Sequence, residues 1–190
     1  MKTYTKAKNL SDYIVSIANS TMPFVIAVDG FGGSGKSSLC KELSNLLPDV
    51  MTIQTDDFIK YPHKPNVFDH DWSAIESKVL KRLKKDTRVI TKTYGWNALG
   101  PANEQHDVKH FVLVDGIGLL ESKYIDYFDL KIWIDCPYEI ALARGKKRDK
   151  EEQDIDHDLL WDKVWGPGSK LYFKRARPDL NADLLFRTYY

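Results

Sequence analysis

The stretch Gly30–Ser37 reads GFGGSGKS, which matches G-x-x-x-x-G-K-[ST], and it directly follows the apolar run Phe24–Val28. A strand that leads into a glycine loop and then a helix can hold a triphosphate, because N–H groups at a helix N-terminus bind anionic oxygen. We predict that Lys36 reaches the β- and γ-phosphates and that Ser37 ligates Mg²⁺. A flexible turn between a strand and a helix is the alternative. The predicted nucleotide-binding residues are Gly30, Gly32, Gly33, Ser34, Gly35, Lys36, Ser37 and Ser38.

The composition is ordinary for a globular protein, and the chain of 190 residues is long enough for one domain with a sizeable core. Its 28 lysines and arginines nearly balance 27 aspartates and glutamates, so we expect no nucleic-acid partner. No apolar run reaches transmembrane length and no signal-type stretch follows the N-terminus, which favours a cytoplasmic protein without a membrane partner. Cys40 and Cys136 lie in apolar patterns and are predicted to be buried small hydrophobes. Homo-oligomer formation is left open.

Short apolar strands alternate with amphipathic helices along the chain. The predicted strands are Phe24–Val28, Val50–Thr55, Arg88–Thr93, Phe111–Val114, Leu130–Ile134 and Leu184–Phe186. Helices are predicted after a cap at Ser11, after the glycine loop, from Trp72 to Leu83, from Pro137, and from Asp156 towards Arg177. This alternation predicts an α/β fold with a parallel sheet and right-handed crossovers. Ligands in such sheets bind beyond the carboxyl ends of the strands.

Two carboxylates follow strand ends at this edge. Asp56 comes after the strand Val50–Thr55, where a carboxylate can accept the proton of an attacking hydroxyl. A helix cap or turn is the alternative for Asp56, and Asp57 is the weaker candidate for the base. Asp115 ends the run Phe111–Val114, the usual place for a carboxylate that orders Mg²⁺. Its alternative role is a turn residue at the strand end.

A basic cluster follows a further predicted strand. Arg144, Lys146, Lys147 and Arg148 lie towards the end of the helix that is predicted to start at Pro137. Arginine matches phosphate bidentately, so this segment could close over the triphosphate as a lid and stabilise the transferring group. The alternative is favourable charge at a helix C-terminus, which needs no ligand.

Residues after the second strand are candidates for binding the acceptor. Asp69 could accept hydrogen bonds from a sugar diol, whereas Asp71 is equally suited to cap the following helix. His70 lacks metal-ligand spacing and is interpreted as a surface or structural residue. Tyr94 and Trp96 could stack on a base or form a buried aromatic pair.

These motifs together resemble the uridine kinase family of P-loop nucleoside kinases. The segments that carry the resemblance are Gly30–Ser37, Asp56-Asp57-Phe58, Phe68-Asp69-His70, Val112-Leu113-Val114-Asp115-Gly116, Leu142-Ala143-Arg144 with Arg148-Asp149, and Ala182-Asp183-Leu184. The resemblance spans most of the chain from Phe24 onward. The glycine motif occurs in many families, and the order and spacing of the other segments are the specific part.

The resemblance implies a P-loop NTPase fold, a three-layer α/β/α arrangement around a mainly parallel five-stranded sheet. It also implies ATP or GTP as donor, Mg²⁺, and transfer to a ribose 5′-hydroxyl. By motif position, Asp56 would be the catalytic aspartate, Asp69 the contact to the ribose diol, and Arg144 and Arg148 the lid arginines. We therefore expect one kinase domain over residues 1–190, with an acceptor-binding insertion over 56–100 that includes Tyr94, and a lid region over 144–170.

Three positions depart from the family pattern. Gly145 stands where members often carry a second adjacent lid arginine, and Asp115 stands where a glutamate is common. Tyr94 follows a stretch without the usual proline, and no nearby histidine matches the base contact. These departures leave phosphoryl transfer intact and leave the identity of the acceptor open.

Two other functions compete with a nucleoside kinase. Asp29-Gly30 also resembles cytidylate kinases, whose acceptor already carries a phosphate. Residues 49–75 contain no arginine and several aspartates, which would repel a phosphate and favour a neutral hydroxyl acceptor. A nucleotide-binding switch without a small-molecule acceptor is the second rival, and the chain lacks the N-K-x-D motif that is typical of GTPase switches.

Overall fold

The computed structural model describes residues 1–18, 23–59, 70–92, 103–152 and 156–189. Its centre is a six-stranded parallel sheet in the order β1-β8-β7-β2-β6-β3. The strands are β1 (Lys2–Tyr4), β2 (Phe24–Asp29), β3 (Val50–Gln54), β6 (Phe111–Asp115), β7 (Leu130–Asp135) and β8 (Leu184–Arg187). Every residue of β2 and β6 is buried, which explains why both strands read as continuous apolar runs.

The sheet has one strand more than the five that the resemblance implies. The additional strand is β1, a three-residue segment that pairs with β8 at one edge of the sheet. It carries no apolar pattern because its first two residues are exposed. The predicted strand over residues 88–93 forms outside this sheet. There, β4 (Arg88–Lys92) pairs antiparallel with β5 (Glu104–Asp107) in a separate two-stranded sheet.

Helices cover the sheet in the predicted order. The helical segments are α1 (Ala7–Ile17), α2 (Lys36–Leu46), η1 (Thr55–Phe58), α3 (Trp72–Ala74), η2 (Ile75–Leu80), η3 (Ile125–Tyr127), α4 (Tyr138–Glu152), α5 (Asp158–Leu160), η4 (Trp161–Trp165), α6 (Gly166–Ala176) and α7 (Pro178–Asn181). The last long helix is therefore a chain of α5, η4 and α6, with a π-helical turn in its middle. Arg177 follows it in a left-handed conformation with φ of 45°, directly before Pro178.

The predicted cap of the first helix is wrong. Helix α1 begins at Ala7, so Ser11 lies in its second turn and is buried. The Ser11 hydroxyl donates to the carbonyl oxygen of Lys8 at 2.8 Å. This bond inside the helix takes the place of the bond that a capping serine would make to a backbone N–H at the helix end. By contrast, Asp71 does cap α3, because its carboxylate accepts a hydrogen bond from the Ala74 N–H at 3.0 Å.

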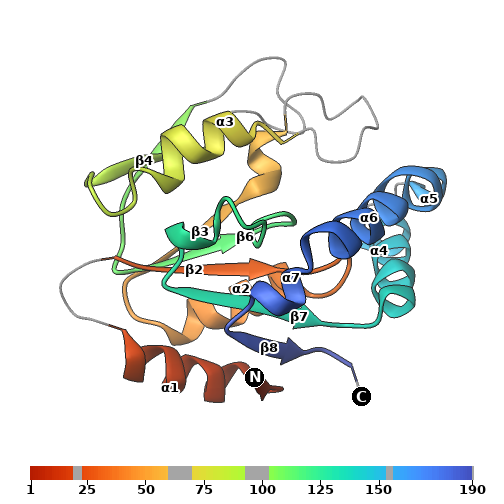
Figure 1. Ribbon diagram of the computed structural model, residues 1–190, viewed down its shortest axis with the longest axis horizontal. Coiled ribbons are helices and arrows are strands. Elements are labelled where there is room, and N and C mark those ends of the chain that lie inside the picture. The colour runs from red at the N-terminus through yellow and green to blue at the C-terminus, as the bar shows by residue number, and fades with distance from the viewer. Residues whose placement is uncertain (19–22, 60–69, 93–102, 153–155, 190) are drawn as a thin grey trace.

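The carboxyl end of the sheet faces helices α4 and α6 (Figure 1). Figure 1 shows α2 behind the sheet and α6 and α7 in front of it, with the arrowheads of β2 and β8 directed towards α4 and α6. Helix α3 and the pair β4–β5 lie beyond the β3 edge, in agreement with contacts between β3 and β4. The carboxyl ends of the strands therefore meet the loop after β2, the turn after β3 and helix α4.

Several further features of the described residues bear on the sequence predictions. Cys40 and Cys136 are both buried and do not form a disulfide, as predicted. Within the described part of the chain, no helix has the length and apolar character that crossing a membrane requires.

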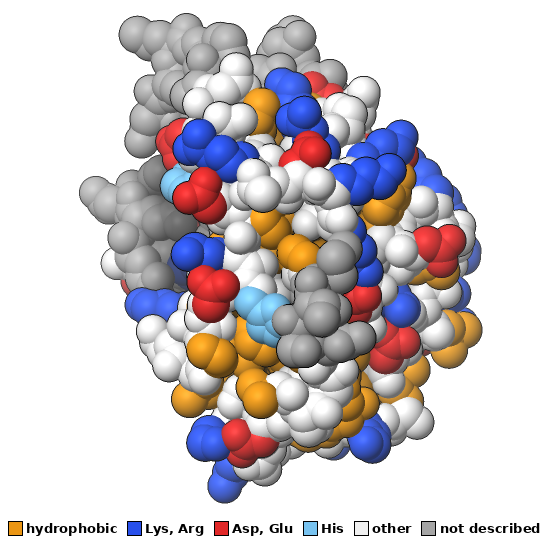
Figure 2. Space-filling view, turned by 90° about the vertical axis from the view of Figure 1, so that its left-hand side faces the viewer, with side chains coloured by type: hydrophobic (Ala, Val, Ile, Leu, Met, Phe, Trp, Pro, Cys, Tyr) orange, Lys and Arg blue, Asp and Glu red, His pale blue; other side chains and the backbone are white. Residues whose placement is uncertain are grey.

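Figure 2 shows basic and acidic side chains interspersed on one face of the molecule, with hydrophobic side chains gathered in its lower part.

Candidate functional site

The glycine loop connects β2 to α2, as predicted from the motif. Gly33 and Gly35 have φ of 77° and 103°, values that glycine adopts without the strain of a Cβ atom. A Cβ atom at Gly33 would also collide with the backbone of α4 at Ala141 and would lie 2.7 Å from the Gly145 nitrogen. The loop is thus tightly turned and pressed against α4, so both its shape and its neighbour require glycine.

Lys36 is the first residue of α2, and its side chain folds back over the loop. Its ammonium nitrogen donates to the carbonyl oxygens of Gly30 and Phe31, at 3.2 and 3.0 Å. A positive charge is therefore held at the N-terminus of a helix, where anionic oxygen is also favoured by the helix dipole.

Ser37, in the first turn of α2, meets Asp115 at the end of β6. The Ser37 hydroxyl donates to Asp115 Oδ2 at 2.6 Å. Burial raises the pKa of Asp115, and the charge of Asp56 adds to this effect, while Lys36 and the Ser37 hydrogen bond oppose it. A hydroxyl and a carboxylate are the hard oxygen donors that Mg²⁺ prefers, so these two residues fit a magnesium site completed by phosphate oxygens and water.

Asp56 lies in η1 directly after β3. Its Oδ1 atom lies 3.1 Å from Nε2 of His70, and the Asp56 side chain is 61% exposed. Desolvation by surrounding atoms raises the pKa of Asp56, but the His70 hydrogen bond and the charges of His70, Lys36 and Arg148 outweigh it. The net pKa lies below the usual aspartate value, so Asp56 is ionised at neutral pH and able to accept a proton.

The candidate residues from three strand ends act on one another electrostatically. Desolvation raises the pKa of both Asp56 and Asp115, and the positive charge of Lys36 opposes it by lowering the pKa of each carboxyl. Arg148 also lowers the pKa of Asp56. The structure therefore brings Lys36, Asp56, Asp115 and Arg148 into one region, with Ser37 bonded to Asp115.

The arginines predicted to form a lid, Arg144 and Arg148, lie within α4 rather than at its end. Because α4 continues to Glu152, the alternative of charge at a helix C-terminus is wrong for Arg144 and Arg148. Arg148 donates to Asp149 Oδ1 from Nε at 3.1 Å and from Nη2 at 2.8 Å. Arg144 donates from Nη2 to the carbonyl oxygen of Thr188 at 3.0 Å.

Thr188 in turn connects the C-terminal segment to the glycine loop. Its hydroxyl donates to the carbonyl oxygen of Ser34 at 2.9 Å, while Arg144 Nη1 lies 3.4 Å from the same hydroxyl. The other two basic residues of the cluster form ion pairs within the predicted lid region, Lys146 with Asp162 at 2.7 Å and Lys147 with Glu151 at 3.7 Å. Arg144 is thus linked to the glycine loop through Thr188, whereas Arg148 bonds Asp149 and acts on Asp56 through its charge.

Two predicted acceptor-binding residues fall outside the described residues. These are Asp69 and Tyr94; Trp96, the other candidate for stacking on a base, also lies outside the described residues. The part of this region that the structure describes adds one residue that sequence reasoning interpreted otherwise, since His70 is the hydrogen-bond partner of Asp56. Its place beside Asp69 in a motif of the resembled family was the signal that could have identified it.

Asp29 is a buried carboxylate that the sequence reasoning did not single out as a site residue. It is fully buried at the end of β2, and it accepts hydrogen bonds from the N–H groups of Gly30 at 2.7 Å and Leu120 at 3.0 Å. The Tyr172 hydroxyl of α6 donates to it at 2.6 Å. Burial raises the pKa of Asp29 to about 6, although these hydrogen bonds and the charge of Lys36 act in the opposite direction. Asp29 thus ties the start of the glycine loop to α6.

The raised pKa of Asp29 predicts a pH dependence of stability. Because the folded-state pKa of about 6 exceeds the ordinary value of 3.8, Asp29 contributes stability below pH 3.8 that is lost as pH rises through 6. The loss approaches about 3 kcal/mol. The test is the free energy of unfolding in urea, measured from about pH 4 to pH 8. In Asp29→Asn, the decrease of this free energy that Asp29 causes should be absent.

Tyr172→Phe serves as the matched comparison, because it removes a hydrogen bond that lowers the pKa of Asp29. In this variant the decrease of the unfolding free energy with rising pH should extend to higher pH and keep its sign. Wild type and Asp29→Asn with identical slopes would show that Asp29 does not titrate in this range.

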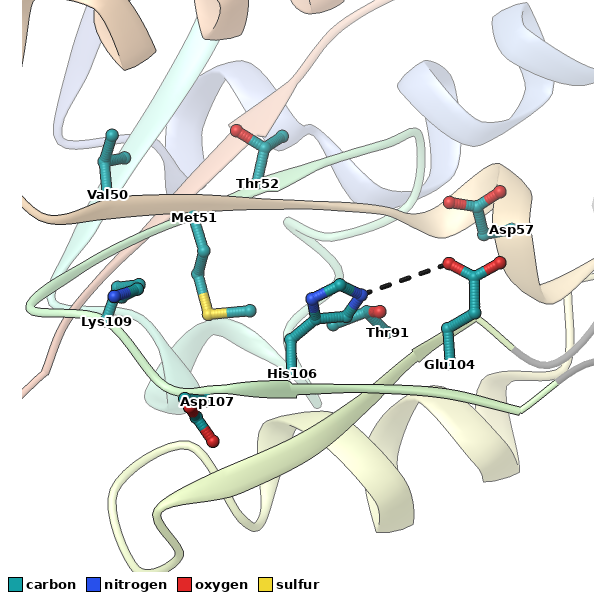
Figure 3. Close-up of a pocket in the computed structure, with 9 residues that line it drawn as sticks. All are labelled: Val50, Met51, Thr52, Asp57, Thr91, Glu104, His106, Asp107 and Lys109. Atoms are coloured by element: carbon teal, nitrogen blue, oxygen red, sulfur yellow. Dashed lines mark ion pairs between the residues drawn. The ribbon is translucent and has the colours of Figure 1, made fainter.

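A separate cavity lies along the outer edge of β3. Figure 3 shows it between β3 and the pair β4–β5, with side chains of both lining it. Its volume is about 500 Å³, and its lining residues are Val50, Met51, Thr52, Asp57, Thr91, Glu104, His106, Asp107 and Lys109. On the β5 side of the cavity, His106 Nε2 lies 4.0 Å from Glu104 Oε2 of the same strand. The lining includes none of Lys36, Ser37, Asp56 or Asp115, so this cavity is distinct from the glycine-loop site.

Comparison with known proteins identifies relatives over most of the chain. The model of the AAA domain family matches residues 26–163. A uridine kinase of Borreliella burgdorferi (strain ZS7) is 28% identical over 185 residues, covering 86% of each chain. A uridine kinase of Clostridium tetani is 29% identical over 160 residues, covering 74% of this chain and 75% of the relative. The resemblance seen in the motifs is thus confirmed over most of the chain.

Solved structures share the fold. A possible uridine kinase from Bacillus stearothermophilus superimposes with a TM-score of 0.74 at 19% identity, covering 95% of this chain and 96% of that one. A candidate fructose transport system kinase from Silicibacter sp. TM1040 reaches a TM-score of 0.75 at 18% identity, covering 95% and 98%. The predicted P-loop α/β fold is confirmed, and at these identities the likeness concerns the fold alone.

Proposed function

The chain belongs to the AAA domain family, and we propose that it is an ATP-dependent kinase that transfers the γ-phosphate to a hydroxyl of a small, nucleoside-like acceptor. The observation that carries the proposal is the convergence of Asp56 with Lys36, Ser37 and Asp115 at the carboxyl ends of β2, β3 and β6. A donor site with a phosphate-binding loop then faces an ionised carboxylate, which is the arrangement that phosphoryl transfer to a hydroxyl needs.

In this mechanism Lys36 exchanges its contacts with the loop carbonyls for the β- and γ-phosphate oxygens and offsets their charge. Asp56 orients the acceptor hydroxyl and takes its proton, and His70 holds the Asp56 carboxylate in place. Mg²⁺, held by Ser37 and Asp115, would supply charge neutralisation on the phosphates. Arg144 and Arg148 act from the lid to exclude water and stabilise the transferring group.

The chemistry of the acceptor side supports an unphosphorylated substrate. The described parts of residues 49–75 hold Asp49, Asp56, Asp57 and Asp71, and the full segment has no arginine. Arginine is the residue suited to a phosphate on the acceptor. The names of the relatives support a nucleoside, and we propose that residues 56–100 form the acceptor-binding insertion and 144–170 the lid of a single kinase domain. The cytoplasmic location stays a prediction.

An acceptor screen tests this proposal. ADP release is measured with ATP and Mg²⁺ in the presence of uridine, cytidine, nicotinamide riboside, pantothenate or CMP, and the phosphorylated product is identified by mass. We expect at least one unphosphorylated hydroxyl compound to accelerate ADP release and to gain one phosphate. Turnover of CMP alone would instead establish a nucleoside monophosphate kinase, the function favoured by the likeness of Asp29-Gly30 to cytidylate kinases.

The same assay separates the kinase from a nucleotide-binding switch. A switch would hydrolyse ATP or GTP at the same rate with and without every acceptor and would form no phosphorylated small molecule. The presence of Asp56 and the lid arginines favours the kinase, because a switch needs neither a base for an acceptor hydroxyl nor a lid that excludes water.

A further inference from the structure

One tryptophan of the lid region lies directly on the glycine loop. Trp161 is 5% exposed, and a Cβ atom built on Gly32 would lie 2.9 Å from its ring. A Cβ atom on Gly145 of α4 would lie 2.5 Å from the same ring. Real Cβ atoms do not approach other heavy atoms so closely, so the indole fills the space left by two missing side chains, one on the loop and one on α4.

The other end of the indole is held by a buried carboxylate. Trp161 Nε1 donates to Asp149 Oδ2 at 2.8 Å, and the Asp149 side chain is 3% exposed. The second oxygen of Asp149 accepts from Arg148, with Nη2 at 2.8 Å. His157 Nδ1 also lies 3.1 Å from Asp149 Oδ2. A single carboxylate thus connects the tryptophan on the loop to an arginine that acts on Asp56.

We propose that Trp161 is a positioning residue, which seats the lid on the glycine loop through Gly32 and Gly145 and, through Asp149, sets the place of Arg148 for phosphoryl transfer. The role of Arg148 rests on the proposed function, whereas the seating of the lid does not. Because Trp161 of η4 packs against both Gly32 of the loop and Gly145 of α4, movement of the lid and the shape of the loop are coupled through one side chain. Gly145, which departs from the family pattern, is then required by the indole.

A double-mutant cycle at residues 145 and 161 tests the seating. Gly145 lies inside α4. At a helix position without steric conflict, replacing glycine by alanine raises the folding equilibrium constant about two- to fivefold. We expect Gly145→Ala to destabilise the protein instead, since its Cβ collides with the indole. In a Trp161→Ala background, which opens this space, the same change should stabilise. The free energy of unfolding in urea is measured for all four proteins. The expected result is that the effect of Gly145→Ala on this free energy reverses sign between the two backgrounds.

Equal effects of Gly145→Ala in both backgrounds would overturn the seating of the lid. This comparison needs no enzymatic activity, so it remains decisive if the proposed kinase function fails in the acceptor screen. Folding of each variant is checked by its cooperative urea transition, and Trp161→Leu replaces Trp161→Ala if the latter does not fold.

The link to Arg148 is tested with a variant that keeps the ring. Trp161→Phe retains most of the packing on Gly32 and Gly145 but loses the N–H that donates to Asp149. We expect kcat for transfer to fall about tenfold, while KM for ATP and the dissociation constant of ADP change by less than about threefold. The fraction of ATP hydrolysed without transfer should rise, because a loosely held lid admits water.

Trp165→Phe is the matched control, because Trp165 lies in the same helical segment and contacts the Trp161 ring edge-on at 5.2 Å between centroids. We expect it to leave kcat within about twofold of wild type. An unchanged kcat and an unchanged hydrolysis fraction in Trp161→Phe would overturn the link to Arg148. Tighter ADP binding in that variant would also overturn the proposal, because it would mean that the indole obstructs the loop.

Discussion

Replacement of Lys36 by alanine is expected to reduce kcat for phosphoryl transfer by about a thousandfold or more. The Lys36 ammonium lies over the glycine loop, bonded to the carbonyl oxygens of Gly30 and Phe31. In the transition state the transferring group and the leaving ADP carry negative charge there, and no neutral side chain can offset it. Steady-state ADP release with the acceptor found in the screen measures the effect.

Lys41→Ala is the control for this change. Lys41 is an exposed lysine on the same helix, so its removal alters the net charge equally but leaves the loop untouched. We expect its kcat to stay within about twofold of wild type. Full activity in the Lys36 variant would refute the assignment of the loop as the donor site, and with it the proposed kinase.

Replacement of Asp56 by asparagine should lower kcat by about a hundred- to ten-thousandfold and leave KM for ATP nearly unchanged. The amide has nearly the same shape as the carboxylate, but it cannot take the proton of the acceptor hydroxyl. The separation of kcat from KM follows because the donor is held by the loop and Lys36 rather than by Asp56. Initial rates over a range of ATP concentrations, at saturating acceptor, measure both parameters.

The pH profile adds a second measure of Asp56. Desolvation raises its pKa, but His70, Lys36 and Arg148 together bring it below the usual aspartate value, so the base stays ionised as pH falls through the ordinary range. Activity of the wild type should therefore persist to lower pH than an unperturbed aspartate would allow. Asp57→Asn removes the same charge one residue away, and a loss as large as that of Asp56→Asn would assign the effect to charge alone.

The parts of the site that the sequence predicts well depend on local spacing. The loop Gly30–Ser37 begins after a buried strand and ends in a helix, and residues that follow strand ends must share one edge of a parallel sheet. The positions of Lys36, Ser37, Asp56 and Asp115 follow from these rules. The Arg144–Arg148 pair follows less completely, because the sequence placed it at a helix end and the structure extends α4 beyond it.

Other features have no local signal. Strand β1 is a short polar segment that becomes a strand only because β8 offers it an open edge. The partners of Asp29 lie 91 and 143 residues away in the chain, at Leu120 and Tyr172. An aspartate at the end of an apolar run looks the same whether it faces water or a buried hydroxyl, so its raised pKa could not be predicted from the sequence.

The sequence by itself determined the donor half of this protein: a phosphate-binding loop between a buried strand and a helix, with carboxylates at the neighbouring strand ends. That much depends on backbone geometry, which residue spacing encodes directly. Only the tertiary structure decided which distant groups hold that site, namely Tyr172 on Asp29, His70 beside Asp56, and Trp161 on Gly32 and Gly145. Burial and hydrogen bonding are properties of segments that meet in space, and the order of residues along the chain does not specify which segments meet.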